Sequence, residues 1–286
     1  MLWFFLSLAA ALSVATSDAL CKYALKEFDE KVVAWARWGL AAPFLLLLLP
    51  FIEIPHLGRE FWLVAAAAVP LEIAAIIIYM KAIHISPLSL TIPFLALTPV
   101  FLIVTSFIFL GELPDISGSA GIFLIAAGAY LLNIDSPGSS VWDPFRSILR
   151  EKGSLLMIVV AFIYSITSVL GKGAIIHSSP FFFALVYPVI VATFLSPFAF
   201  AGYRQNSEAV NGRPILFILI GLTNAVMIAC HFWAVSLVEV AYMISIKRTS
   251  MVFAVFYGWF FFREVNLRER LLGSVVMAAG AALILI

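Results

Sequence analysis

IFLGELPDISGSAGIFLIAAG, residues 108–128, returns 152 positions later as FFFREVNLRERLLGSVVMAAG, residues 260–280. Among the residues that keep their identity at this spacing are the pairs Glu112 and Glu264, Gly121 and Gly273, and Gly128 and Gly280. Lys22 and Lys172, 150 positions apart, extend the pattern to the start of the chain. An apolar chain duplicated end to end is typical of secondary transporters, whose halves move about a shared site at the membrane midplane. A duplicated helical bundle without a transport role is the alternative.

The composition indicates a protein of the lipid bilayer. Hydrophobic residues make up 64% of the chain and charged residues 12%, with a mean hydropathy of +1.10. A soluble domain has about half apolar residues and about a quarter charged ones. The net charge of +1 and the lack of a basic tail give no reason to expect a nucleic-acid partner. Cys21 and Cys230 fall inside apolar segments, which predicts small packing residues rather than a disulfide or a metal site.

A membrane-spanning helix needs about 20 mostly apolar residues, and ten segments meet this requirement. They are residues 2–21, 32–52, 61–80, 88–110, 116–134, 154–176, 181–201, 214–236, 240–262 and 271–286. The sequence therefore predicts an all-α integral membrane protein with ten transmembrane helices. The polar stretch 136–153 predicts a linker between one five-helix repeat, residues 1–135, and another, residues 154–286. Because five is odd, the second repeat enters the membrane from the opposite side, so the repeats are inverted.

Lysine and arginine are distributed unevenly over the predicted connections. Most lie in the odd-numbered connections, and only Arg59 and Lys172 lie in the even-numbered ones. By the positive-inside rule the odd connections are cytoplasmic and both termini face outward. We expect a multi-pass protein of the cell inner (plasma) membrane. The first span should be retained rather than cleaved as a signal peptide, because no basic residue precedes its apolar run.

These features resemble the drug/metabolite transporter superfamily, in particular its EamA branch, over essentially the whole chain. The resemblance rests on the two five-helix units, the glycine pairs, the corner Leu110-Gly-Glu112 and the stretch Pro93-Phe-Leu-Ala-Leu-Thr-Pro99. The second unit departs from the family pattern, because Arg263 precedes its glutamate and it lacks matching prolines. The resemblance implies this fold and a transport function. It leaves the substrate open, since the branch resembles exporters of amino acids, nucleobases, drugs and other metabolites.

The glycine pairs predict close helix contacts. Gly121 and Gly128 are seven residues apart and share one face of the fifth helix, where backbones can approach closely, and the tenth helix repeats the arrangement. We expect these two helices to be a scaffold or to form homodimer contacts rather than to wall a cavity. Glu112 and Glu264 are expected at the membrane edge as partners of helix ends.

Ionisable residues inside the spans are few, and each costs about 2.5–3.5 kcal/mol on insertion scales, so they should face a cavity or a partner. They are Asp18, Arg37, Glu72, His231, Lys247 and Arg248. Glu72 is the first candidate, because it lies at mid-span with Tyr79 on the same helical face. Desolvation would favour its protonated form and suit a proton carrier. A nearby cation would favour a structural ion pair instead.

Lys247 and Arg248 form the one adjacent basic pair inside a predicted span. Adjacent helix positions point about 100° apart, so the two side chains cannot face the same spot. Tyr242 and neighbouring serine and threonine residues add hydroxyl groups. Such a patch would hold a carboxylate or phosphate strongly in a low dielectric. The alternatives are an ion pair with Glu72 or Asp18, and snorkelling to the membrane interface.

Polar residues also recur at helical spacing in other spans. Tyr164 and Ser168 in the sixth span and Asn224 in the eighth are candidates for the cavity wall. Asp18 can pair with Lys22 four residues further on.

The fourth span carries Pro93 and Pro99. Each proline removes a backbone hydrogen bond and frees a carbonyl group near the membrane centre. Broken helices that line a cavity are how secondary transporters bind substrate and hinge. The pair therefore predicts a helix break with a gating role, with a simple kink as the alternative.

Together these residues predict a secondary transporter that exports a small polar metabolite, amino acid-like and anionic or zwitterionic, with a proton as co-substrate or by exchange. The expected substrate-binding residues are Lys247, Arg248, Tyr79, Asn224, Tyr164, Tyr242 and Ser168. The expected proton-coupling residues are Glu72, Asp18 and His231. No catalytic residue, cofactor or metal is expected, because enzyme and ATPase motifs are absent from the sequence. The alternative is a flippase for a lipid-linked or amphiphilic substrate, whose polar stripes face a lateral cleft.

Overall fold

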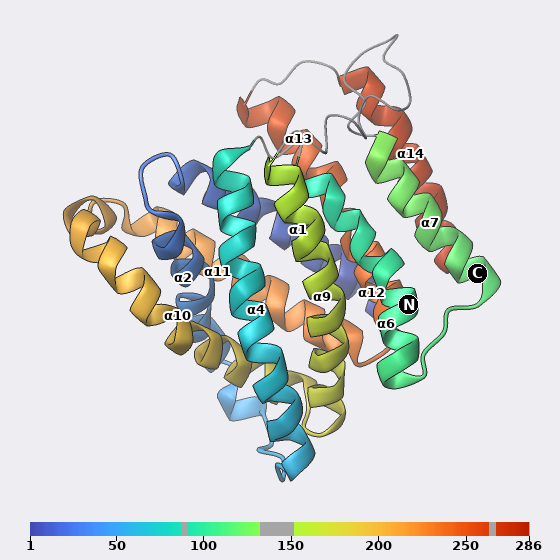
Figure 1. Cartoon of the computed structure of the whole chain (residues 1–286), viewed down its shortest axis with the longest axis horizontal. Coiled ribbons are helices and arrows are strands. Elements are labelled where there is room, and N and C mark those ends of the chain that lie inside the picture. The colour runs from blue at the N-terminus through green and yellow to red at the C-terminus, as the bar shows by residue number, and fades with distance from the viewer. Residues whose placement is uncertain (87–90, 132–151, 263–266, 286) are drawn as a thin grey trace.

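The computed structural model describes residues 1–86, 91–131, 152–262 and 267–285, and every regular element in these ranges is a helix (Figure 1). In chain order the elements are α1 (Leu2–Ala24), α2 (Glu30–Gly39), α3 (Ala41–Leu46), η1 (Leu49–Phe51), α4 (Arg59–Ile85), η2 (Ile92–Ala96), α6 (Leu97–Leu110), α7 (Ile116–Leu131), α9 (Lys152–Ile176), α10 (Pro180–Asn211), α11 (Pro214–Val235), α12 (Val240–Lys247), α13 (Ser250–Phe262) and α14 (Leu267–Ile284). Most of the predicted linker and Glu264 lie outside the described residues.

Within the described residues, five helices are long and apolar enough to cross a membrane, namely α1, α4, α9, the Pro180–Phe200 part of α10, and α11. Shorter apolar helices cover Phe94–Leu110, Ile116–Leu131 and Leu272–Ile284. These helices agree with the predicted all-α membrane fold. The predicted spans 32–52 and 240–262 are each divided between shorter helices, so the count of ten remains a prediction.

The predicted fourth and ninth spans are interrupted at equivalent positions of the two repeats. In the first repeat, the 3₁₀ helix η2 ends at Ala96 and α6 follows directly. In the second, Arg248 and Thr249 separate α12 from α13. Ala96 and Arg248 are 152 positions apart, which is the repeat spacing. Prolines predicted the first break, whereas the second, which contains none, was not predicted.

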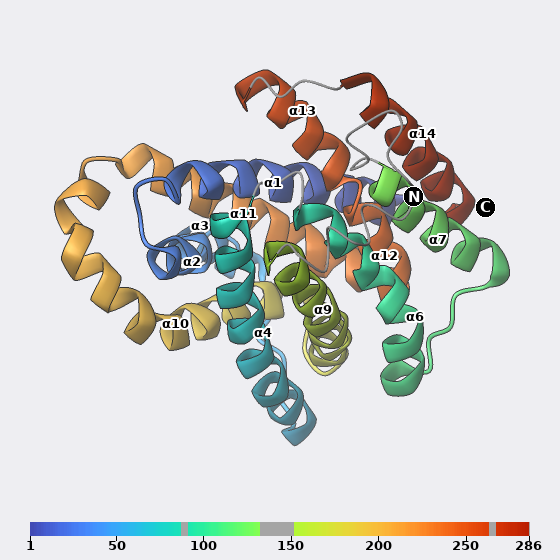
Figure 2. The same ribbon diagram turned by 45° about the horizontal axis from the view of Figure 1, so that its top comes forward.

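Helices of the two predicted repeats pack in matching pairs. α4 packs along α9, and their counterparts α11 and α1 pack along each other. α2 contacts its counterpart α10, and α7 contacts its counterpart α14; the two pairs lie at opposite ends of the molecule in both views (Figures 1 and 2). This arrangement leaves α1, α4, α9, α11 and α12 in the middle.

The helices α7 and α14 meet through the predicted glycines. A Cβ atom on Gly121 would lie 2.6 Å from the carbonyl oxygen of Gly280, and one on Gly128 would lie 2.7 Å from that of Gly273. The two backbones therefore touch, and the helices run antiparallel, as an inverted repeat requires of equivalent helices. The scaffold interpretation of these glycines is confirmed. Their faces are used within one chain, so a homodimer would need another surface and remains a prediction.

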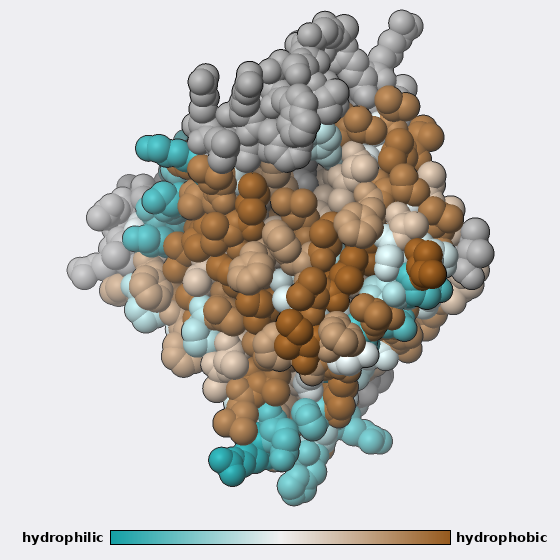
Figure 3. Space-filling view, turned by 45° about the vertical axis from the view of Figure 1, so that its right-hand side comes forward, coloured by the Kyte–Doolittle hydropathy of each residue, from teal (hydrophilic) through white to brown (hydrophobic). Residues whose placement is uncertain are grey.

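The outer surface of the described helices is largely apolar. Figure 3 shows hydrophobic residues in a broad brown band, with polar residues in teal gathered at its lower end and at its upper left. Large side chains such as Phe107, Phe194 and Ile215 are more than half exposed. Soluble monomers rarely expose apolar patches of this extent. The band therefore suits contact with the lipid bilayer.

Candidate functional site

An internal cavity of about 100 Å³ lies among the central helices. The predicted site residues that line it are Glu72, Tyr79, Tyr164, Ser168, His231, Lys247 and Arg248. α2 contributes Arg37 and Trp38 to the wall, and α10 contributes Phe183 and Tyr187. No described residue of α7 or α14 lines it, as expected for scaffold helices.

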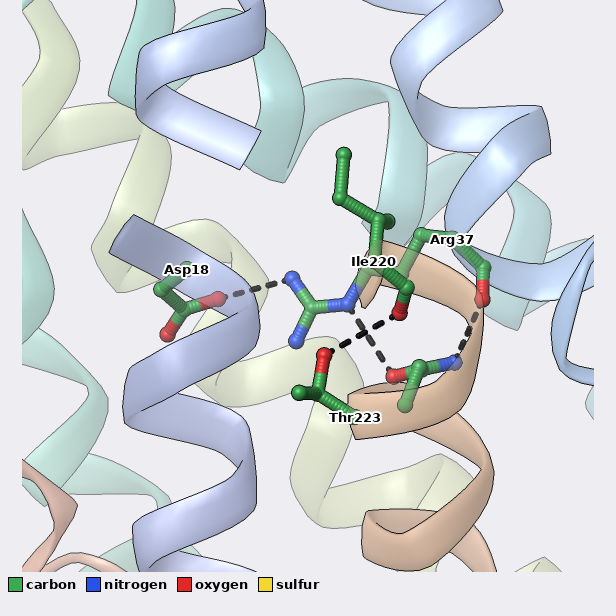
Figure 4. Close-up of polar contacts among 5 residues, drawn as sticks. Asp18, Arg37, Ile220 and Thr223 are labelled. Carbon is green, nitrogen blue, oxygen red and sulfur yellow. Dashed lines mark hydrogen bonds and ion pairs between the residues drawn. The ribbon is translucent and has the colours of Figure 1, made fainter. Parts of the chain in front are cut away.

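Arg37 of α2 is a buried cation that was not predicted as a site residue. Its Nη1 donates to Asp18 Oδ1 of α1 at 2.8 Å, and its Nε donates to Asn224 Oδ1 of α11 at 3.2 Å (Figure 4). The Asn224 amide donates in return to the Arg37 carbonyl at 2.8 Å. All three residues are more than nine-tenths buried. The network therefore fixes the guanidinium beside the cavity, 5.4 Å from the centre of the Tyr79 ring.

This network corrects one prediction and reassigns two residues. Asp18 pairs with Arg37 rather than with Lys22, so the predicted pair four residues apart is wrong. Asp18 and Asn224 are not among the residues that line the cavity. The structure places both beside Arg37, where they hold its position.

Glu72 lies near the middle of α4 on the cavity wall, and only 8% of it is exposed. The Thr167 hydroxyl of α9 lies next to its carboxyl group, and Lys247 lies within electrostatic reach. Among the described residues, no ion pair joins Glu72 to a cation. The structure therefore does not form the ion pair that was the structural alternative.

Lys247 and Arg248 have different partners, as their adjacency requires. Lys247 Nζ lies 3.1 Å from His231 Nδ1, so a charged lysine makes Nδ1 the acceptor of a neutral imidazole. Arg248 Nη2 donates to Thr98 Oγ1 at 2.8 Å. Arg248 Nε and the Tyr79 hydroxyl are buried without a hydrogen-bond partner in the described part of the chain.

The two helix breaks meet at Arg248. Its partner Thr98 lies in the first turn of α6, directly after the break in the first repeat. At the second break the backbone forms 3₁₀-type bonds, and the Thr249 hydroxyl donates to the Ile246 carbonyl at 2.7 Å. Pro99 is buried in the first turn of α6, whereas the side chain of Pro93 in η2 is outside the description. The predicted break thus lies beside the cavity, and the hydrogen bond from Arg248 to Thr98 connects it to a substrate-binding candidate.

Part of the cavity wall is aromatic. Phe183 stacks on Tyr187 with 4.7 Å between ring centroids, and Phe232 meets Phe183 edge-on at 4.8 Å. Trp38 meets Tyr187 edge-on at 6.1 Å. None of these residues was predicted for the site, because the chain has 26 phenylalanines and periodicity does not separate cavity-facing rings from lipid-facing ones.

The structure does not bring Tyr242 to the cavity. Its hydroxyl donates to Asp115 Oδ1 and accepts from the Asp115 amide, both at 3.1 Å, and its ring fills the space that a Cβ on Gly118 would need. The Gly118 amide, 2.7 Å from the carboxylate, and this hydroxyl lower the pKa of Asp115. Tyr242 therefore supports the start of α7 and is not among the residues that line the cavity.

Lys22 and Lys172 each hold the turn that leads into a broken helix. Lys22 Nζ donates to the carbonyl groups of Ile83 at 2.5 Å and Ser86 at 3.0 Å, at the end of α4. Lys172 Nζ donates to the Val238 carbonyl at 2.8 Å, between α11 and α12. Ser86 and Val238 differ by the repeat spacing of 152. We call these contacts the Lys22 clasp and the Lys172 clasp.

The Lys172 clasp also joins the two repeats. Glu112 forms an ion pair with Lys172 through Oε1, and its Oε2 accepts the Val240 amide at 3.1 Å at the start of α12. Gly111 ends α6 with a φ of 68°, a left-handed conformation that favours glycine, and so turns the chain into this corner. The prediction that Glu112 is a partner of a helix end is confirmed.

Comparisons with known proteins support this architecture. The model of the EamA-like transporter family matches residues 1–134 and 151–286. A crystal structure described only as that of a protein resembles the chain with a TM-score of 0.70 and 13% sequence identity, over 99% of this chain and 98% of that chain. At this identity the likeness shows the fold alone. A search of curated proteins gave no match.

Proposed function

The chain belongs to the EamA-like transporter family, and from this premise we propose that its central cavity carries a small anionic or zwitterionic metabolite across the bilayer. The observation that carries the proposal is a pair of buried donors at the cavity. Arg248 Nε and the Tyr79 hydroxyl have no partner among the described residues. A buried donor left unsatisfied costs about 1–3 kcal/mol. A substrate carboxylate would satisfy both donors.

The balance of charge around the cavity favours the same class of substrate. Arg37, Lys247 and Arg248 face two carboxylates, and one of these, Asp18, is already bonded to Arg37. Glu72 can offset only one of the two remaining cations. A bound carboxylate would balance the other, and hydrogen bonds from arginine to a carboxylate are among the stronger ones in proteins.

The anion site is tested with Arg248→Gln, which removes the charge and keeps most of the side-chain length. Loss of a charge-assisted hydrogen bond of about 1.5–3 kcal/mol would weaken substrate affinity by about 10- to 150-fold. Solid-supported-membrane currents from reconstituted protein, with a panel of monocarboxylates, dicarboxylates and amino acids, measure the half-saturating concentration. Arg213→Gln is the matched control, because Arg213 is an exposed arginine paired with Glu27 outside the cavity. Equal affinities in wild type and Arg248→Gln would rule out the anion site.

Energy coupling is proposed to act through Glu72. It is a buried carboxyl group at the cavity without an ion-pair partner in the described structure, so its protonation would change the charge of the site. Glu72→Gln mimics the protonated form permanently and should flatten the dependence of the transport current on pH. Glu60→Gln, at the exposed start of the same helix, is the control. A pH dependence like that of the wild type, with normal flux, would exclude Glu72 as the proton carrier.

One observation keeps a flippase as the second candidate. A groove of about 570 Å³ opens between α2, α10 and α11, and its lining is mostly apolar, including Trp35, Phe200 and Phe217. Most of the polar candidates, however, line the central cavity, and none of them lines this groove. Transport of a fluorescent phospholipid that is independent of ion gradients, in liposomes that show no current with the metabolite panel, would favour the flippase.

A further inference from the structure

The cavity has two distinguishable ends, which can be identified along α4 and α9. Near one end the rings of Tyr79 and Tyr164 are 6.4 Å apart, and near the other a Cβ on Gly173 would lie 3.5 Å from the Val64 side chain. Glu72 lies between these levels on α4. The two helices therefore run antiparallel along the cavity, and positions along them can be placed in order.

The tyrosine end of the cavity carries the unsatisfied donors. Arg248 lies within electrostatic reach of both Tyr79 and Tyr164. Its Nε and the Tyr79 hydroxyl are the buried cavity atoms without partners in the described chain. This end is built for a group that accepts hydrogen bonds.

The opposite end is apolar and lined by aromatic rings. Gly171 follows Tyr164 by seven residues of α9, a rise of about 10 Å. A Cβ on Gly171 would lie 3.7 Å from the Phe232 ring and 3.8 Å from the Phe183 ring, so a methyl group would fit in contact with both. Phe183 and Tyr187 stack beside it. Flat rings favour such surfaces through stacked and edge-on contacts.

We propose that the substrate carries a carboxylate and a planar apolar group, and that Gly171 determines how large this group can be. The carboxylate binds Arg248 Nε and the Tyr79 hydroxyl, and the ring lies against Phe183 and Phe232. This inference rests on the proposed transport of an anion or zwitterion, and it adds the apolar part of the molecule. It also explains the absence of a side chain at residue 171, where the helix faces the rings.

The size of the cavity makes Gly171 decisive. At about 100 Å³ the cavity is smaller than the roughly 300–1,000 Å³ of most ligand sites. The helices must therefore separate to admit a ring, and each methyl group added at the wall removes a substantial part of the space. Gly173, two residues further along α9, faces Val64 and is not part of the lining.

The test compares phenylacetate with acetate, and phenylalanine with alanine, on reconstituted full-length protein by solid-supported-membrane currents and calorimetric binding. Within each pair the charged groups are the same and only the ring differs. The variants are Gly171→Ala and Gly171→Leu, with Gly173→Ala and Gly173→Leu as matched controls that place the same groups outside the cavity. The second pair distinguishes a zwitterionic substrate from a simple anion.

Wild type should bind the ring-bearing member of at least one pair more tightly, by about 10-fold or more. Gly171→Leu should abolish this preference, because it should weaken binding of the ring-bearing member more than binding of the small member, while Gly171→Ala should reduce the preference partly. Both Gly173 variants should retain the preference. Phe232→Leu, which removes the aromatic ring of the wall, should also reduce the preference for the ring-bearing member. It provides an independent test if Gly171→Leu does not fold.

Two results would overturn the inference. Equal affinities within both pairs would show that the ring adds nothing, and an equal loss for large and small members in Gly171→Leu would show a general distortion. Binding of acetate or alanine that depends on Arg248, without any ring preference, would refute this inference and leave the proposed anion site standing. Failure of all four probes to bind would refute both.

Discussion

Replacing Lys172 with glutamine removes the ammonium group that joins Glu112 to the Val238 carbonyl and retains most of the side-chain length. Lys22→Gln does the same to the equivalent clasp. A Cβ on Gly153, at the start of α9, would collide with the Ser86 side chain of the Lys22 clasp, and Lys172 lies 19 residues further along that helix. The two clasps are therefore about 28 Å apart along the helix, close to the hydrocarbon thickness of a bilayer.

In a bilayer this separation would put the clasps at opposite faces, so we expect opposite effects on alternating access. The side chains of Lys172 and Glu112 are only 13% and 19% exposed. A charge-assisted hydrogen bond in such surroundings contributes about 1.5–3 kcal/mol. If this hydrogen bond exists only while one face is closed, its loss would shift the equilibrium between closed and open forms of that face toward the open form by about 10- to 150-fold.

A single cysteine in the cavity reports the shift. Ser168→Cys, in a background with Cys21→Ala and Cys230→Ala, places a thiol on the lining, and a membrane-impermeant maleimide labels it in right-side-out or inside-out vesicles. With both termini outward, as the loop charges predict, Lys172→Gln should accelerate labelling from outside and Lys22→Gln labelling from the cytoplasmic side. Faster labelling of both variants from the same side, or no change in either, would refute the assignment of the clasps to opposite gates.

Two further predictions concern stability. Gly128→Leu should lower the free energy of unfolding by about 1–3 kcal/mol, because its Cβ would lie 2.7 Å from the Gly273 carbonyl oxygen. The change is measured as a lower thermal unfolding midpoint in detergent, and Gly173→Ala should leave this midpoint nearly unchanged. Equal midpoints for both would argue against the tight α7–α14 contact. Asp18→Asn should cost about 3–5 kcal/mol by leaving Arg37 buried without its partner, and the double variant with Arg37→Gln should cost less than the sum of the single changes. Additive effects in this cycle would show that the pair is not coupled.

The fold could be predicted from the sequence where signals repeat or accumulate over many residues. The duplication at 152 positions and the apolar composition indicated a membrane protein with two related halves, and the glycine pairs indicated which helices form the scaffold. The break at Arg248 could not be predicted in this way. It depends on the Thr249 hydroxyl bonding the Ile246 carbonyl and on Arg248 reaching Thr98, and these contacts exist only in the folded chain.

The cost of burying charge identified Glu72, Lys247 and Arg248, and the structure places all three on the cavity wall. Arg37 was recognised as an ionisable residue within a span, but its network with Asp18 and Asn224 joins α1 and α2 to α11, which is distant from both in sequence. Tyr242 was misplaced for a related reason. Periodicity placed it near the basic pair on the same helix, whereas its partner Asp115 belongs to the other half of the chain.

The two repeats use different chemistry at equivalent breaks, and this difference has a functional consequence. In the first repeat Pro93 and Pro99 remove backbone donors, which interrupts the helix without adding charge. In the second, Arg248 occupies the position equivalent to Ala96, so one repeat supplies the cation and the other supplies its Thr98 partner. A substrate carboxylate that draws Arg248 away from Thr98 would release the contact between the two breaks. Binding would then break the hydrogen bond between Arg248 and Thr98 that joins the two repeats. The bound substrate would thereby favour movement of the repeats, which is the coupling that alternating access requires.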